Sequence, residues 1–247
     1  MLSIDLNCDM GESFGQYKLG KDEVVMPFIT SANIACGFHA GDPLVMQSTI
    51  RLAKKYSVAI GAHPGWPDLQ GFGRREMNLS PEETEAIILY QIGALAGSAK
   101  AEGAELRHIK PHGSLYNQAA KDRILANAIA RAVNAFSADL ILVGLAGSRL
   151  IEAGIELGLH VANEGFPDRN YNLDGTLVSR KQANAIIESP DEVAVHALRL
   201  AQNGIDFSGR HVNVETLCLH GDNIYAAENA RLIRDTLSKN KILVEAI

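Results

Sequence analysis

The sequence contains little cysteine and no pattern that would join cysteines in pairs. Its three cysteines, Cys8, Cys36 and Cys218, are an odd number, lie far apart and form no Cys-X-X-Cys motif. This spacing argues against a disulfide framework and against a zinc site built from thiolates. We therefore expect three reduced and largely buried thiols.

Basic residues and long apolar runs are also scarce. The 23 Lys and Arg residues face 29 Asp and Glu residues, a formal net charge of -6, so no cationic surplus is available to bind a phosphate backbone. The longest apolar run, residues 140–146, is far shorter than the roughly 20 residues that span a bilayer. The first basic side chain is Lys18, unlike the charged start of a signal peptide. We expect a cytoplasmic protein that binds neither nucleic acid nor membranes.

Three common nucleotide and metal motifs are missing as well. The sequence has no Gly-X-X-X-X-Gly-Lys-Ser/Thr loop, no Gly-X-Gly-X-X-Gly fingerprint after a strand and no His-Glu-X-X-His motif. A P-loop nucleotide site, a Rossmann dinucleotide site and a helix-borne zinc site of that type are therefore excluded.

Seven short runs of apolar and β-branched residues recur along the chain and are typical of buried strands. Most of them lack an alternation of polar and apolar residues, as expected for parallel strands that are covered on both faces. These predicted strands cover residues 2–6, 32–36, 58–62, 106–109, 140–145, 159–162 and 216–219.

Segments with helical spacing lie between the predicted strands. Two helix starts are marked by serine, proline and two acidic residues, in Ser80-Pro81-Glu82-Glu83 and Ser189-Pro190-Asp191-Glu192. Two apolar stripes with steps of three or four residues indicate buried helix faces, one at Ile88, Ile92, Leu95 and Ala99 and one at Leu125, Ile129, Val133 and Phe136. The alternation continues through residues 1–247 without a linker, which predicts one α/β domain, either an open doubly wound sheet or a barrel.

Ionisable and polar residues gather just after most of the predicted strands. In a parallel barrel all strand carboxyl ends open onto one face, so these residues are expected to converge in one pocket. Helix capping is the alternative interpretation for Asp42, Asp222 and Asn223. The residues are Asn7, Asp9 and Glu12 after the first strand, His39 and Asp42 after the second, His63 after the third, Lys110 and His112 after the fourth, Glu164 and Asp168 after the sixth, and His220 and Asp222 after the seventh.

The chemistry of these residues suits catalysis, although spacing leaves their roles open. Lys110 would be held at its strand end, where a buried ammonium can polarise a carbonyl or hold an anion. The histidines of the set can shuttle protons, donate to a substrate or bind a metal, and Asp9, His39 and His63 form one possible metal site. By contrast, His108 lies within a predicted strand and is expected to be a core residue.

Several longer motifs resemble those of the LamB/YcsF family. Because the motifs are long, chemically unusual and spread over nearly the whole chain, chance is a poor explanation for the match. They are LNCDMGESFG (residues 6–15), SANIACGFHAGD (31–42), GAHPG (61–65), GFGRR (71–75), IKPHGSLY (109–116), EGFPDR (164–169) and LHGD (219–222).

The resemblance implies a fold, a reaction and partners. The fold is a distorted seven-stranded parallel β/α barrel of the glycoside hydrolase/deacetylase type. The reaction is that of a 5-oxoprolinase, which converts 5-oxoproline, ATP and water into L-glutamate, ADP and phosphate. ATP is the cosubstrate and is accompanied by magnesium. The resemblance also implies B and C partner subunits. Since the chain has no nucleotide motif, we expect the partners to bind much of the ATP. Direct ATP contact and a bound metal stay open.

The implied mechanism assigns roles to the clustered residues. Lys110 and either Arg74 or Arg75 offset substrate charge, Asp9 or Glu12 serves as general base, and His112 or His220 donates a proton to the ring nitrogen. The remaining expected substrate-binding residues are Asn7, His39, Asp42, His63, Glu164, Asp168, Arg169 and Asp222. Two alternatives remain: a metal-dependent amide hydrolase or deacetylase that acts alone, and a non-catalytic subunit that binds a small anionic metabolite.

Overall fold

Seven parallel strands close into a barrel in the computed structural model, which describes residues 2–179, 182–219 and 225–247. In barrel order the strands are β1 (Ser3–Met10), β2 (Ser31–Ala35), β3 (Ala59–His63), β4 (Leu106–Ile109), β5 (Ile141–Leu145), β6 (His160–Gly165) and β9 (Thr216–Leu219). The last strand pairs with the first, where residues 216–219 align with residues 5–8. The closure confirms the seven predicted strands and the barrel, and it excludes the open doubly wound sheet.

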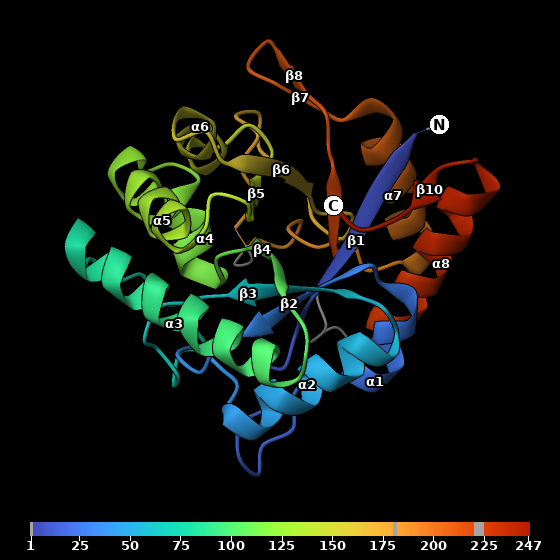
Figure 1. Cartoon of the computed structure of the whole chain (residues 1–247). Helices are drawn as coiled ribbons and strands as arrows, with labels where there is room; N and C mark the ends of the chain where they lie inside the picture. Colours follow the sequence, from blue (N-terminus) through green and yellow to red (C-terminus); the bar gives the residue numbers. More distant parts are fainter. Residues whose placement is uncertain (1, 180–181, 220–224) are drawn as a thin grey trace.

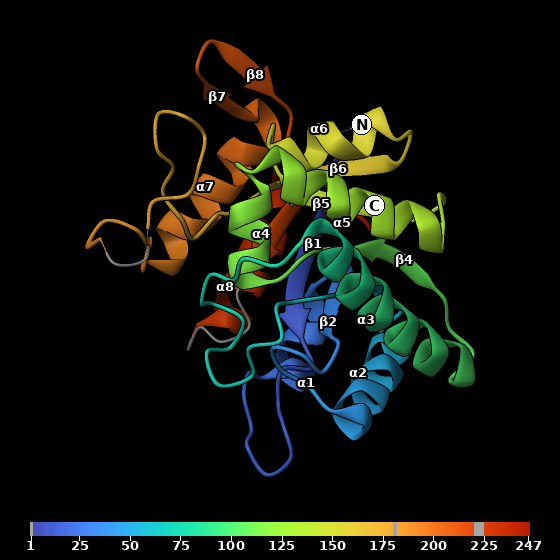
Figure 2. The ribbon, with the colours of Figure 1, turned by 90° about the vertical axis from the view of Figure 1, so that its left-hand side faces the viewer.

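Helices surround the barrel on its outer side (Figure 1). They are α1 (Asp22–Val25), α2 (Pro43–Lys55), α3 (Pro81–Ala101), α4 (Gly113–Ala119), α5 (Arg123–Phe136), α6 (Arg149–Glu156), α7 (Pro190–Asn203) and α8 (Ala226–Lys239), with the short 3-10 helix η1 (Met26–Phe28) after α1. The antiparallel hairpin of β7 (Ile205–Phe207) and β8 (Arg210–Val212) projects from one side (Figures 1 and 2). Near the end of the chain, β10 (Leu243–Val244) pairs with the beginning of β1.

The two predicted helix starts are confirmed. Helix α3 begins after Ser80, whose Oγ accepts a hydrogen bond from the Glu83 backbone N–H at 3.1 Å. The Glu83 side chain accepts from the Ser80 backbone N–H at 2.8 Å, which completes a capping box. Helix α7 begins after Ser189 with Pro190 in its first turn, but the Ser189 side chain makes no capping hydrogen bond.

The apolar helix faces pack against the strands and form the core of the molecule. All four residues of the stripe on α3 are fully buried. On α5, Leu125, Ile129 and Val133 are buried, whereas Phe136 is 38% exposed. The prediction was wrong for Phe136 because α5 ends at this residue, so its side chain lies at the edge of the packed face.

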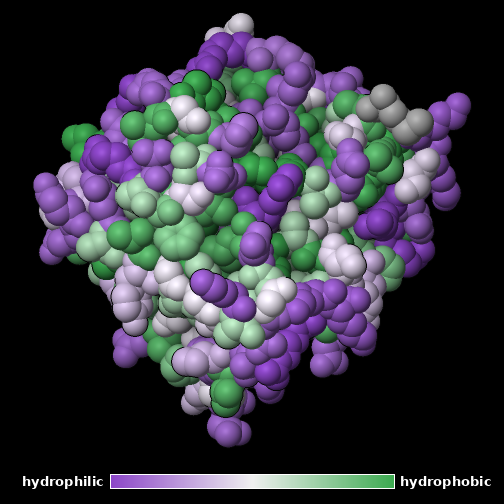
Figure 3. Space-filling model, viewed as in Figure 1, coloured by the Kyte–Doolittle hydropathy of each residue, from purple (hydrophilic) through white to green (hydrophobic). Residues whose placement is uncertain are grey.

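Some helices also expose large apolar side chains, such as Tyr90 on α3 and Ile124 on α5. Apolar and hydrophilic side chains are interspersed over the face shown in Figure 3, as is usual for a folded surface. Over the part of the chain that the structure describes, no helix combines the length and the apolar character needed to cross a membrane.

The interior of the barrel is polar and continuously hydrogen-bonded. The Asn7 amide donates to Glu164 Oε1 at 2.9 Å and to Thr216 Oγ1 at 2.6 Å, and the Asn33 amide donates to Asn7 Oδ1 at 2.7 Å. We predicted that Asn7, Asp9, His63 and Glu164 follow their strands, which is wrong because they lie within β1, β3 and β6. Polar residues interrupt the apolar pattern by which a strand is predicted, so the predicted strands ended before them. Inside the barrel these side chains find hydrogen-bond partners on other strands.

Gly61 allows one of these contacts to form. Asn33, Gly61 and His108 stand side by side in the register of β2, β3 and β4. The buried His108 ring crosses the middle strand to reach Asn33, and its Nε2 lies 2.8 Å from the Asn33 Oδ1. A Cβ at Gly61 would overlap this ring. The structure confirms His108 as a core residue.

Replacing Gly61 by alanine is therefore expected to destabilise the protein by about 1–3 kcal/mol, because the added methyl group displaces the His108 ring. The matched control is Gly97→Ala in the interior of α3, where the space beside the glycine is open. This control should stabilise the protein by about 0.5–1 kcal/mol. Urea denaturation measures both changes, and equal free energies of unfolding for the two variants would contradict the assigned packing.

Candidate active site

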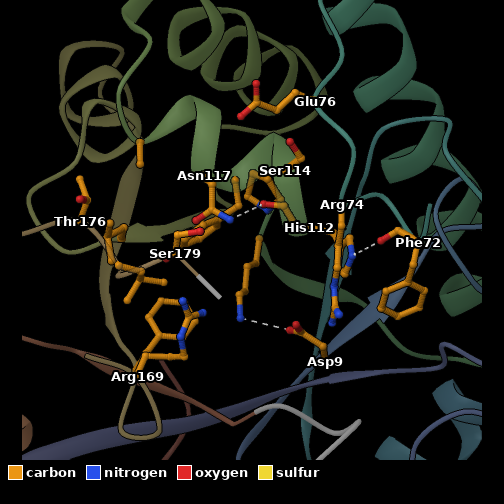
Figure 4. A pocket seen from close by; sticks show the side chains of 18 of the residues that line it. Asp9, Phe72, Arg74, Glu76, His112, Ser114, Asn117, Arg169, Thr176 and Ser179 are labelled. Atoms are coloured by element: carbon orange, nitrogen blue, oxygen red, sulfur yellow. Dashed lines mark hydrogen bonds and ion pairs between the residues drawn. The ribbon is translucent and has the colours of Figure 1, made fainter. Parts of the chain in front are cut away.

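A cavity of about 900 Å³ opens at the carboxyl ends of the barrel strands. Its wall is formed by the ends of β1, β3 and β4, by the segments that follow them, and by the segment after β6. Figure 4 shows Arg169 on one side of this cavity, with Asp9, Arg74 and His112 on the other. The predicted site residues that line it are Asp9, Glu12, His63, Arg74, Arg75, Lys110, His112 and Arg169.

Lys110 occupies the floor of the cavity directly after β4. Its ammonium Nζ lies 2.8 Å from Glu164 Oε1 on β6 and 3.1 Å from Asp9 Oδ1 on β1. The same Nζ lies 3.0 Å from the Cys218 Sγ on β9, and the side chain is only 3% exposed. One buried cation therefore joins the ends of three further strands.

These neighbours decide the protonation of the buried pair. Burial by itself would lower the pKa of Lys110, but the facing Asp9 and Glu164 outweigh this effect and hold it well above its usual value. Burial would raise the pKa of Asp9, yet His63 and Lys110 hold it well below its usual range. At neutral pH the site therefore contains an ammonium beside an ionised carboxylate.

Three histidines and one glutamate meet beside this ion pair, and we call Glu12, His39, His63 and His112 the histidine cluster. The His63 Nε2 and the His112 Nδ1 are 3.0 Å apart. The Glu12 Oε1 lies 3.7 Å from both the His39 Nε2 and the His112 Nδ1. All four residues are buried, and one candidate ligand atom from each lies within 4.8 Å of the others.

Burial keeps two histidines of the cluster neutral. The pKa of His112 is lowered to about 3, mainly by burial and then by the nearby His63. Burial also lowers the pKa of His39 well below its usual value, helped by His112, on which the His39 ring stacks at 3.7 Å. Neutral imidazoles are the form that binds metals. Of the predicted metal set, His39 and His63 belong to the cluster, and Asp9 lies beside it, with its Oδ1 3.1 Å from the Lys110 Nζ and its Oδ2 3.3 Å from the His63 Nε2.

The arginines of the cavity differ in their surroundings. Arg75 forms an ion pair with Asp68, and its Nε donates to the Asp68 carboxylate at 2.7 Å. The Arg74 guanidinium lies over the Phe72 ring, 5.0 Å from its centroid. Arg169 is buried and donates to the backbone carbonyls of Ala185 and Val178. The charge of Arg75 is therefore offset within the chain by Asp68.

Other predicted site residues lie away from the cavity wall. Asn7 and Glu164 lie beneath Lys110, with the Asn7 Oδ1 at 3.2 Å from its Nζ. Asp42 caps α2 by accepting from the Leu44 and Val45 N–H groups, so helix capping describes its observed contacts. Asp168 is buried just after β6. The predictions for His220, Asp222 and Asn223 lie outside the described residues.

The structure adds residues that the sequence did not single out. Phe72 accepts a hydrogen bond from the His112 Nε2 through its backbone carbonyl at 2.9 Å. Ser114 and Asn117 line the cavity from α4. Cys218 was expected only to be buried, but the strand register places it beside Asn7 and its thiol beside Lys110. Helical spacing after the Lys110 motif could have indicated that Asn117 faces the cavity. No local signal in the sequence indicates that the Cys218 thiol lies beside Lys110.

Comparison with known proteins gives matches over the full length of the chain. The LamB/YcsF family matches residues 4–247. A protein of Pyrococcus furiosus named as the A subunit of 5-oxoprolinase is 53% identical, covering 98% of this chain and 97% of its own. A Bacillus licheniformis protein of the same name is 52% identical, covering 100% and 99%. The crystal structure of the lactam utilization protein from Thermus thermophilus superimposes with a TM-score of 0.92, at 46% identity and full coverage of both chains.

The neutral buried histidines predict a pH-dependent stability. The pKa of His108, like that of His112, is lowered to about 3 from 6.5, chiefly by burial. Below the unfolded value the unfolded chain binds more protons at these positions, so the free energy of unfolding should fall as the pH falls through this window. Each such histidine contributes a slope of about 1.4 kcal/mol per pH unit.

Urea denaturation between about pH 6 and pH 4 measures this slope. The variant His108→Gln removes one titrating group away from the cavity, so its slope should be smaller by about 1.4 kcal/mol per pH unit. The same slope in this variant as in the parent chain would show that His108 is not held neutral in the folded state.

Proposed function

The chain belongs to the LamB/YcsF family, and we propose that it is the lactam-cleaving subunit of an ATP-dependent 5-oxoprolinase. In the proposed reaction 5-oxoproline, ATP and water give L-glutamate, ADP and phosphate, and the chain works together with B and C subunits. The observation that carries the proposal is the buried Lys110 ammonium at the floor of a cavity, in a chain similar over its full length to proteins named as the A subunit of 5-oxoprolinase.

The substrate class fits the charges of the cavity. 5-Oxoproline is a small anion that carries a carboxylate and a five-membered lactam. Arg74 and Arg169 line the cavity and supply positive charge for the carboxylate. The Lys110 ammonium lies near the developing negative charge of the lactam oxygen or of a phosphoryl group, where a fixed cation stabilises the transition state.

In the proposed reaction ATP activates the lactam carbonyl. A five-membered lactam is a stable amide, and transfer of the γ-phosphoryl group to the lactam oxygen turns that oxygen into a leaving group. Water then attacks the ring carbon and the bond to the ring nitrogen breaks, which leaves an acyl phosphate. A second water molecule hydrolyses the acyl phosphate and releases L-glutamate and phosphate. Because the sequence has no P-loop, we assign most of the ATP binding, with its magnesium ion, to the partner subunits.

In the proposed mechanism, groups on the cavity wall carry out the proton transfers. Asp9 and Glu12 are the carboxylates of the cavity wall that lie beside Lys110 and the histidines, and one of them serves as base for the attacking water. His112 is neutral, and its Nε2 proton is donated to the Phe72 carbonyl, so its Nδ1 faces the cluster as an acceptor. Of the two histidines proposed as proton donor, His220 is therefore favoured over His112.

Reconstitution tests the proposal directly. Glutamate release from 5-oxoproline with ATP and magnesium should occur when the chain is mixed with its B and C subunits, and not with the chain alone, because the chain has no P-loop of its own. Release by the chain alone would place ATP use in this subunit. No release from either mixture would contradict 5-oxoproline as the substrate.

Replacing Lys110 by methionine should lower kcat/KM of the reconstituted enzyme at least about a hundredfold, because a buried cation at the reacting oxygen is lost. The matched control is Lys100→Met, at the exposed end of α3, which should retain the parent activity. Coupled assays of glutamate and phosphate release give both values.

The loss of Lys110 also leaves Asp9 and Glu164 without their shared cation, which itself destabilises the fold. The double variant Lys110→Met with Glu164→Gln removes one of the two carboxylate charges and should recover stability without recovering activity. Full activity in a folded Lys110→Met variant would remove Lys110 from the mechanism.

A further inference from the structure

The contacts of the histidine cluster determine which ring nitrogens carry protons. The His63 Nδ1 lies 2.6 Å from the Lys110 backbone carbonyl, and the His112 Nε2 lies 2.9 Å from that of Phe72. A carbonyl oxygen only accepts hydrogen bonds, so both of these nitrogens are donors. His112 is neutral, so its Nδ1 carries a lone pair. This lone pair faces the His63 Nε2 at 3.0 Å, and the same His63 Nε2 lies 3.3 Å from the Asp9 Oδ2.

Ring nitrogens this close to each other and to a carboxylate oxygen need a positive centre, a proton or a metal ion, between or beside them. The other members of the cluster point to the same need. His39 is fully buried, and neither of its ring nitrogens has a hydrogen-bond partner among the described residues. A buried polar atom without a partner costs about 1–3 kcal/mol. Its Nε2 lies 3.7 Å from a carboxylate oxygen of Glu12, which supplies negative charge.

The separations match the coordination sphere of a small transition-metal ion. Zinc binds imidazole nitrogen and carboxylate oxygen at about 2.0–2.1 Å, so neighbouring ligand atoms of a tetrahedral site lie about 3.3–3.4 Å apart. Three pairs in the cluster are 3.0, 3.7 and 3.7 Å apart, and one ligand atom from each residue lies within 4.8 Å of the others. The hydrogen bonds from His63 and His112 to backbone carbonyls also orient the rings in the way that is usual for metal-bound histidine.

We propose that the histidine cluster is a binding site for one divalent transition-metal ion of the zinc type, held by Glu12, His39, His63 and His112. Three nitrogen ligands favour zinc, cobalt or nickel over magnesium, so this site is distinct from that of the magnesium that accompanies ATP. Glu12, His63 and His112 line the cavity, so the ion lies within reach of a bound carbonyl or water molecule, which it can polarise.

The proposal goes beyond the proposed reaction, since it rests on ligand geometry and requires no particular substrate. Within that reaction it has one consequence. Glu12 becomes a metal ligand, which leaves Asp9 as the carboxylate that accepts a proton from the attacking water.

Metal binding to the tag-free full-length chain tests the proposal without any assay of activity. After treatment with a chelator, the chain is titrated with Co²⁺ and the visible absorption of the bound ion is recorded, followed by displacement with Zn²⁺. We expect one ion per chain and an absorption typical of nitrogen and oxygen ligands. The variants His39→Gln and His112→Gln should weaken binding at least about tenfold, since each removes one ligand.

His108→Gln is the matched control, because it also removes a buried imidazole beside the barrel axis but leaves the cluster intact. It should bind cobalt as the parent chain does, and circular dichroism verifies that every variant is folded. Parent-like binding by His39→Gln and His112→Gln would overturn the proposal, as would equal loss in His108→Gln. A folded parent chain that binds neither ion at micromolar concentration would also overturn it, and the facing nitrogens would then share a proton.

Discussion

The site depends on the burial of one ammonium group between two carboxylates. The Lys110 Nζ lies within 3.1 Å of the carboxylates of Asp9 on β1 and Glu164 on β6. The thiol of Cys218 on β9 contacts the same nitrogen. Removing these charges from water is costly, and the cost is offset only when every partner is held in place. The ion pair therefore requires a closed barrel, since β1, β6 and β9 become neighbours only through closure.

The polar interior of the barrel supports this ion pair from below. Asn7 contacts Glu164 and Thr216 on one side and Asn33 on the other, so it links three strands beneath the Lys110 ammonium. His108 extends the network across Gly61. These hydrogen bonds connect the interior faces of neighbouring strands and position Glu164 beneath the Lys110 ammonium.

Burial disfavours the charged form of every group in the site, and the neighbouring charges decide which groups remain charged. Lys110 and Asp9 stay charged because each faces opposite charge, whereas His39 and His112 are neutral because burial and their neighbouring histidines disfavour the imidazolium form. The cavity thus combines a fixed positive charge with a group of lone-pair donors. The first suits an anionic transition state, and the second suits a metal ion.

Local signals in the sequence determined the seven strands, the starts of α3 and α7, and the convergence of Asp9, His63, Lys110 and His112, because periodicity and capping depend on near neighbours. Only the tertiary structure decided the rest. Barrel closure turned Asn7 and Glu164 into interior partners of Lys110. It also brought Glu12 into the histidine cluster and Cys218 beside the ammonium. These contacts join strands far apart in the chain, and no spacing between residues specifies them.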